Sequence, residues 1–161
     1  VLGVSAILFY FVAYALMNLG AFSMIVLLTR QGSRAESLED FKGLAKRHPV
    51  WGFCFLLFLL SLAGIPPSAG FVGKFYLFAG AIQAGLYGLA LVAVLNSVVA
   101  LTYYFRVTRN MYMMEERRRP EISPSWALRF SLILLAILTL GFGLFPAPLF
   151  ELVQEASQSI L

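Results

Sequence analysis

The chain has 161 residues, of which 60% are hydrophobic and 12% charged, with a net charge of +4. A water-soluble domain carries about twice that charged fraction, so this composition excludes an ordinary soluble protein. We expect no nucleic-acid partner, because the basic residues form two clusters between apolar runs and do not alternate with base-stacking aromatic side chains.

Four uncharged stretches indicate that a lipid bilayer surrounds this chain. Each is longer than the roughly 18 apolar residues that a crossing needs, and they cover residues 1–29, 49–73, 75–105 and 130–150. Lipid offers no hydrogen bonds to the backbone, whereas a helix pairs its own backbone groups, so such runs predict helices. We therefore expect an all-α polytopic membrane helix bundle that forms a single membrane domain over residues 1–161.

The first crossing is predicted over residues 1–29. It begins at Val1 without an initiator Met or a basic segment, so we expect part of a longer protein and not a signal peptide. In the loop that follows, residues 30–48, Ser37 stands three residues before Asp40, as in a capping box. Apolar residues then recur at helical spacing and predict a short amphipathic surface helix. These apolar positions are Leu38, Phe41 and Leu44.

The apolar stretch over residues 50–113 is too long for one crossing and contains a Pro-Pro pair. Three crossings would leave residues 50–63 to span alone, and 14 residues reach only about 21 Å of a core about 30 Å thick. We therefore expect residues 50–83 to form one crossing that is broken at residues 64–70, with residues 86–113 as the next. The residues of the break are Gly64, Pro66, Pro67 and Gly70.

A fourth crossing is predicted over residues 124–145, ahead of Pro146 and Pro148. The tail over residues 149–161 is amphipathic, and we expect it to lie along the membrane interface. The residues expected on its apolar face are Leu149, Leu152, Val153, Ala156 and Ile160.

The distribution of charge favours four crossings, because the basic loops 30–48 and 110–125 then share one side of the membrane. The opposite side holds the acidic residues Glu151 and Glu155. The positive-inside rule makes the basic side cytoplasmic and puts both ends of the chain outside. The basic residues of that side are Arg30, Arg34, Lys42, Lys46, Arg47, Arg117, Arg118 and Arg119.

Lys74 is the one charged residue expected deep in the membrane, because Arg106, Arg109 and Arg129 fall at crossing ends that face the basic side. A lysine at the bilayer centre costs about 2.5–3.5 kcal/mol on insertion scales, so such residues are candidates for function. Pro66 and Pro67 lack backbone donors and are expected to free carbonyl groups near Leu62 and Ala63. A broken helix is tolerated at membrane depth where it lines a polar cavity. We expect Lys74 to gain and lose a proton there, as an intramembrane proton carrier.

Weaker candidates for a polar path are the other polar residues within the crossings. Such residues also join helices by hydrogen bonds, so a structural role stays open for each of them. They are Tyr14, Asn18, Ser61, Ser68, Asn96 and Ser97. The sequence has no metal-ligand set, cofactor-binding motif or nucleophile–base pair, so we expect no redox centre in this chain. None of the eight acidic residues falls in a predicted crossing, so a carboxylate that balances Lys74 must come from elsewhere.

Three segments resemble the subunit N family of NADH:quinone oxidoreductase, respiratory complex I, which belongs to the antiporter-like membrane subunits. They are YALMNLGAF at 14–22, EDFKGL at 39–44 and LLSLAGIPPSAGFVGKFY at 59–76. The resemblance covers nearly the whole chain, aligned to about the last third of that subunit. It implies a discontinuous second helix and a role for Lys74 in proton translocation along a central polar axis of a bacterial inner membrane complex.

The resemblance also implies that NADH, FMN, the iron–sulfur clusters and quinone are bound by other subunits, and that neighbouring antiporter-like subunits are the partners. Related subunits carry a His and a Lys where this chain has Tyr14 and Asn18. That departure favours subunit N over a subunit of a multi-subunit cation/proton antiporter, which is the first alternative. A structural membrane scaffold is the second, and Lys74 in a broken helix argues against it.

Overall fold

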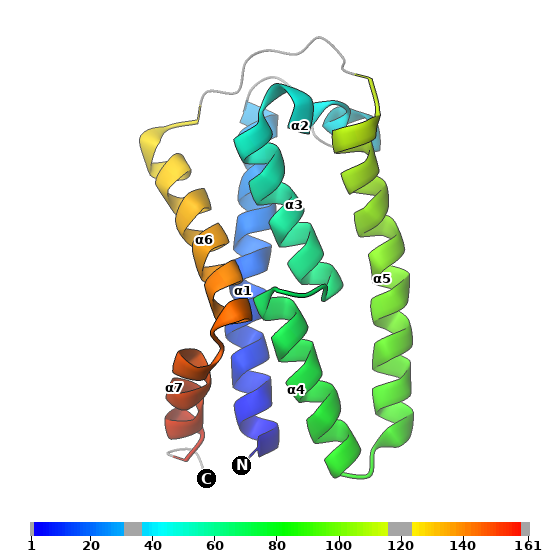
Figure 1. Cartoon of the computed structure of the whole chain (residues 1–161), viewed down its shortest axis with the longest axis vertical. Helices are drawn as coiled ribbons and strands as arrows, with labels where there is room; N and C mark the ends of the chain where they lie inside the picture. The colour runs from blue at the N-terminus through cyan, green and yellow to red at the C-terminus, as the bar shows by residue number, and fades with distance from the viewer. Residues whose placement is uncertain (1, 31–36, 116–123, 159–161) are drawn as a thin grey trace.

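The computed structural model describes residues 2–30, 37–115 and 124–158, and every regular element in these ranges is helical. The prediction of an all-α bundle with a discontinuous second element is confirmed (Figure 1). The elements are α1 Leu2–Arg30, the 3-10 helix η1 Leu38–Phe41, α2 Leu44–Arg47, α3 Pro49–Ala63, α4 Ala69–Gln83, α5 Tyr87–Met113, α6 Trp126–Leu144 and α7 Ala147–Gln158.

Helix lengths separate the complete crossings from the broken one. In the described part of the chain, α1, α5 and α6 are long and apolar enough to cross a membrane, whereas α3 is apolar but shorter. Helices α3 and α4 have 15 residues each, about 22 Å at the helical rise. Figure 1 shows these two helices following one another along the length of α1. Together they match the length of the long helices.

The buried apolar residues form two separate clusters, one on each side of the break. The larger cluster joins the C-terminal half of α1 to α2, α3 and α6, and it includes Met24, Phe58 and Leu132. The smaller cluster joins the N-terminal half of α1 to α4 and α7, and it includes Phe9 and Ala69. The buried apolar residues of α3 therefore lie in one cluster and those of α4 in the other, although the two helices also contact each other.

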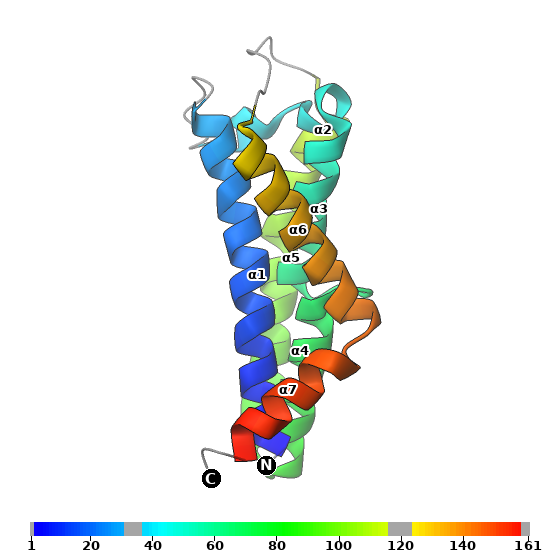
Figure 2. The ribbon, with the colours of Figure 1, turned by 90° about the vertical axis from the view of Figure 1, so that its left-hand side faces the viewer.

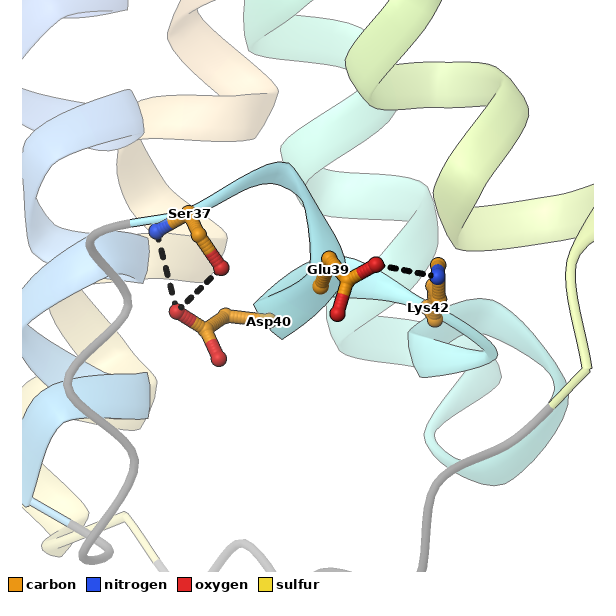
Figure 3. A network of polar contacts seen from close by, with 4 residues as sticks. All are labelled: Ser37, Glu39, Asp40 and Lys42. Atoms are coloured by element: carbon orange, nitrogen blue, oxygen red, sulfur yellow. Dashed lines mark hydrogen bonds and ion pairs between the residues drawn. The ribbon is translucent and has the colours of Figure 1, made fainter.

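The surface segment before α3 differs from the prediction of one amphipathic helix. The Asp40 carboxylate accepts hydrogen bonds from the Ser37 backbone N–H and hydroxyl at 2.9 and 3.1 Å, which supports the predicted start (Figure 3). The segment is nevertheless divided into η1 and α2 at Gly43, whose φ of 72° lies in the left-handed region. Leu38 is exposed instead of sharing the buried face of Phe41. The Gly43 N–H donates to the Asn110 carbonyl of α5, and this tertiary contact overrides a continuous helix.

In α7, only some of the residues that the sequence places on one apolar face are buried against the bundle. Leu149, Val153 and Ser157 are buried, while Leu152 and Ala156 are exposed. Positions four apart lie on one helix face, and α7 presents that face to the N-terminal half of α1 (Figure 2). The hydroxyls of Ser5 and Ser157 lie 3.0 Å apart in this contact. Ile160 lies outside the described residues.

The ends of the bundle differ in charge. Lys46, Arg47 and Arg109 lie where α2 meets the end of α5, far from both chain ends in Figure 1. Glu151 and Glu155 lie on α7, near the other end. Residues Arg34, Arg117, Arg118 and Arg119 and the side chain of Arg30 fall outside what the structure describes.

Candidate functional site

The break between α3 and α4 begins with a glycine that stops α3. Gly64 has φ 84°, and its N–H donates to Ser61 O while the Ile65 N–H donates to Leu60 O. This pattern is a Schellman motif, the usual helix ending with a left-handed glycine. In a continuing helix, Leu62 and Ala63 would accept from the residues four positions later, which are Pro66 and Pro67 and have no N–H. Two carbonyl oxygens are therefore left without backbone donors.

Lys74 fills both of these vacant positions. Its Nζ donates to Leu62 O at 2.8 Å and to Ala63 O at 3.2 Å. The side chain comes from the second turn of α4 and reaches back to the end of α3. An ammonium is favoured there, because the C-terminal end of a helix carries a partial negative charge. These are the carbonyls that the Pro-Pro pair is predicted to free, so the break and the lysine form one unit.

Two serines satisfy the backbone at the start of α4. The Ser61 hydroxyl accepts from the Gly70 N–H at 3.1 Å and donates to the Met17 sulfur at 3.3 Å. The Ser68 hydroxyl accepts from the Phe71 N–H at 3.4 Å and donates to Ile65 O at 2.7 Å. Ser68 is thus the N-cap of α4. Both serines hold the break together and do not lie along the cavity described next.

A cavity of about 370 Å³ opens beside Lys74, between α1, the end of α3, α4 and α5. A water molecule occupies about 30 Å³ in the liquid, so the cavity has room for roughly ten. Three of the predicted path residues, Tyr14, Asn96 and Ser97, line it together with Lys74. Asn18 does not, and its amide instead donates to the Tyr14 carbonyl one turn back on α1. The other lining residues are Tyr10, Leu62, Leu77, Phe78, Ala93, Ala100, Tyr103 and Tyr104.

The tyrosines of the cavity were only partly foreseen from the sequence, which singled out Tyr14 alone. Tyr10 lies one helical turn before Tyr14, and the two ring centroids are 5.7 Å apart. Tyr103 and Tyr104 follow Asn96 and Ser97 by two turns on the same face of α5, with their centroids 4.3 Å apart. Helical periodicity from the polar residues would have found all three.

The cavity contributes hydroxyls and an amide but no acidic side chain. An ion pair joins Lys42 to Glu39 at 2.9 Å on the surface segment, away from the cavity (Figure 3). Within the part of the chain that the structure describes, Lys74 is held by neutral carbonyl oxygens. Among the described residues, no three His, Cys, Asp or Glu side chains lie close enough together to hold a metal ion. In the described ranges, the site therefore combines the Lys74 ammonium, neutral carbonyl oxygens and the hydroxyl and amide groups of the cavity.

In the described part of the chain, three helices are long and apolar enough to cross a membrane, and a fourth element is interrupted and closed by a lysine, so the fold is that of an integral membrane helix bundle. Comparison with known sequences identifies the family. The sequence model of the NADH:quinone oxidoreductase/Mrp antiporter transmembrane family matches residues 1–100, and the chain belongs to this family.

Individual proteins that are similar to the chain in sequence or structure include respiratory-complex subunits. The chain is 45% identical over 155 residues to NADH-quinone oxidoreductase subunit N 2 of Solibacter usitatus. The aligned region covers 96% of this chain and 31% of that relative. Respiratory complex I from Thermus thermophilus contains a chain with a TM-score of 0.76 and 28% identity, over 92% of this chain and 34% of that one. A chain of an archaeal membrane-bound sulfane sulfur reductase has a TM-score of 0.87 and 28% identity, and the match covers 99% of this chain and 32% of that one. The chain spans about a third of the length of the curated relatives that it matches.

Proposed function

We propose that this chain is part of a proton-translocating membrane subunit of an NADH:quinone oxidoreductase, with Lys74 as its proton carrier. One observation carries the proposal. A lysine within the apolar bundle closes a broken helix through two carbonyls and also faces a polar cavity. The names of its relatives, subunit N of NADH-quinone oxidoreductase, supply the reaction to which proton movement is coupled.

The geometry suggests how a proton would be held and released. The protonated lysine donates to Leu62 O and Ala63 O and opposes the partial negative charge at the end of α3. A neutral amine is a weaker donor, so loss of the proton weakens this cap and frees the side chain toward the cavity. Hydroxyl and amide groups of Tyr14, Asn96 and Ser97 would order water there, and this water would relay the proton to a base outside the described residues.

The driving reaction would take place outside this chain. We place NADH, FMN, the iron–sulfur clusters and quinone in other subunits of the complex. The acidic group that responds to Lys74 would come from the longer subunit or from a neighbouring antiporter-like subunit, because the described acidic residues lie in the surface segments and in α7. A change of charge on that acid would shift the proton affinity of Lys74 by Coulomb interaction.

The proposed membrane arrangement has four crossings. Helices α3 and α4 would together make the second, since either alone reaches about 22 Å of a core about 30 Å thick. The charged end with Lys46 and Arg47 would face the cytoplasm of a bacterial cell, and α7 would lie at the outer side of the inner membrane. The excess of basic residues at the first end supports this orientation.

Replacing Lys74 tests the proposal. Lys74→Ala should lower the number of protons moved per NADH oxidised in vesicles that hold the assembled complex. Lys74→Arg should lower it as well, because guanidinium caps the carbonyls but stays protonated at any working pH. Lys46→Ala, at an exposed lysine of α2, is the matched control and should pump normally. Normal pumping by both Lys74 variants at equal assembly would show that Lys74 is not the carrier.

A further inference from the structure

Helix α4 has two faces with different surroundings. Lys74, Leu77 and Phe78 line the cavity. Ala69 belongs to the smaller apolar cluster with Leu149 and Val153 of α7, and Val72 packs against that cluster. Away from the cavity, α4 packs on the N-terminal half of α1 and on α6, and side chains of α7 join it through the smaller apolar cluster.

Three aromatic rings from three helices meet behind the lysine. The rings of Tyr76 on α4 and Phe150 on α7 have centroids 4.7 Å apart. Phe9 of α1 completes the group, at 6.0 Å from Tyr76 and 6.4 Å from Phe150. These separations fall within the range of favourable aromatic pairs. Tyr76 is two residues after Lys74, so the ring group fixes α4 close to the lysine.

The far end of α7 is also fastened to α1. The Ser5 and Ser157 hydroxyls lie 3.0 Å apart and both side chains are buried, and Ser157 additionally donates to the Gln154 carbonyl. Helix α7 thus contacts α1 at one end through hydroxyls and α4 at the other through rings. A helix fastened at both ends can hold α4 at a fixed distance from α3.

We propose that α7 is a brace and that Phe150 is a positioning residue, which keeps α4 where the Lys74 ammonium reaches the carbonyls of Leu62 and Ala63. The reason is the position of the ring group along α4. The contact of α4 with α3 lies at Gly70, whereas Lys74 and Tyr76 lie at least one turn further along, where the rings of Phe9 and Phe150 pack against Tyr76. The inference rests on the proposed role of Lys74, since its effect is measured through proton movement.

The first test removes the ring in the assembled complex and measures protons moved per NADH oxidised in vesicles. Phe150→Ala should lose at least half of the pumping that Lys74→Ala loses, and Phe150→Tyr, which restores the ring, should pump normally. Leu152→Ala lies on the exposed face of the same helix, at 64% exposure, and should match the parent. Normal pumping by Phe150→Ala overturns the brace. So does equal loss in Phe150→Ala and Phe150→Tyr.

A double variant separates positioning from general damage. If Phe150 acts through Lys74, then Phe150→Ala combined with Lys74→Ala should pump no less than Lys74→Ala alone. An additive loss would overturn the inference. The Lys74→Ala variant also keeps the two proposals apart. Normal pumping in Lys74→Ala contradicts the proton-carrier proposal, whereas a defect in Lys74→Ala with normal pumping in Phe150→Ala contradicts only the brace.

A reversible crosslink tests the brace without removing any ring. Ser5→Cys and Ser157→Cys together place two thiols where hydroxyls lie 3.0 Å apart, a separation from which a disulfide can close with small side-chain adjustments. The crosslinked complex should pump at the same ratio before and after reduction, because a brace stays docked through the cycle. Loss of pumping on oxidation, restored by reductant, would show that α7 must leave α1 and would overturn the proposal.

Discussion

Gly70 is the position where the packing of the break can be tested most directly. It is the second residue of α4, and it lies against the last turn of α3. A Cβ built on Gly70 would overlap the carbonyl oxygen of Ser61 and would lie 2.8 Å from its carbonyl carbon. These are backbone atoms, so no side-chain rotation can relieve the contact. Gly70→Ala must therefore push the start of α4 away from α3.

The cost can be worked out from two contributions. Overpacking a well-packed interior costs about 1–3 kcal/mol. Moving α4 also breaks or lengthens the hydrogen bond from the Gly70 N–H to the Ser61 hydroxyl, now 3.1 Å, which is worth about 0.5–1.5 kcal/mol. The sum is about 1.5–4.5 kcal/mol of local stability. At about 1.4 kcal/mol for each factor of ten, the population of open break should rise by roughly 10- to 1,600-fold.

Hydrogen exchange in the assembled complex measures this opening, because local opening controls exchange of protected amides. Amides of residues 68–74 should lose protection by that factor, and proton movement per NADH should fall because Lys74 no longer reaches Leu62 O. Gly80→Ala in the same helix is the matched control. Its added Cβ would meet Gly3 Cα at 3.8 Å, an ordinary contact, so it should be neutral or stabilising. Equal protection in the two variants would refute the packing argument.

Two further predictions concern the cavity and the membrane orientation. Tyr10→Phe and Tyr104→Phe each remove one cavity hydroxyl and should slow proton uptake by up to about tenfold. Tyr87→Phe, at the exposed start of α5, is the control and should not slow it. Unchanged rates in both cavity variants would exclude these hydroxyls from the path. In Lys46→Cys the new thiol should react with a membrane-impermeant reagent only from the cytoplasmic side, and in Gln154→Cys only from the other side. Cys54 is buried and should add little background. Labelling of both variants from one side would contradict four crossings.

The sequence was sufficient for those features that depend on nearby residues. Apolar runs predicted the long helices, and the Pro-Pro pair predicted which carbonyls lose their donors, because a helix pairs residues four apart. Features set by distant contacts could not be read in this way. Gly43 divides the surface helix because its N–H meets Asn110, and the inward face of α7 follows from the contact of Ser157 with Ser5. The cavity is formed across α1, α4 and α5, so its lining depends on their packing.

Most polar groups at the break have a fixed backbone partner. Lys74 differs, because its strength as a hydrogen-bond donor depends on whether its amine is protonated. Ser61 and Ser68 bind backbone amides of α4 and have no charge to change. Loss of the proton leaves a neutral amine, which still has N–H groups but is a weaker donor, so the cap on Leu62 O and Ala63 O weakens. The cost of a charged lysine at membrane depth, about 2.5–3.5 kcal/mol on insertion scales, acts in the opposite direction. Under the proposed function, a change of charge nearby would move the proton, and the same event would loosen or restore the cap on α3.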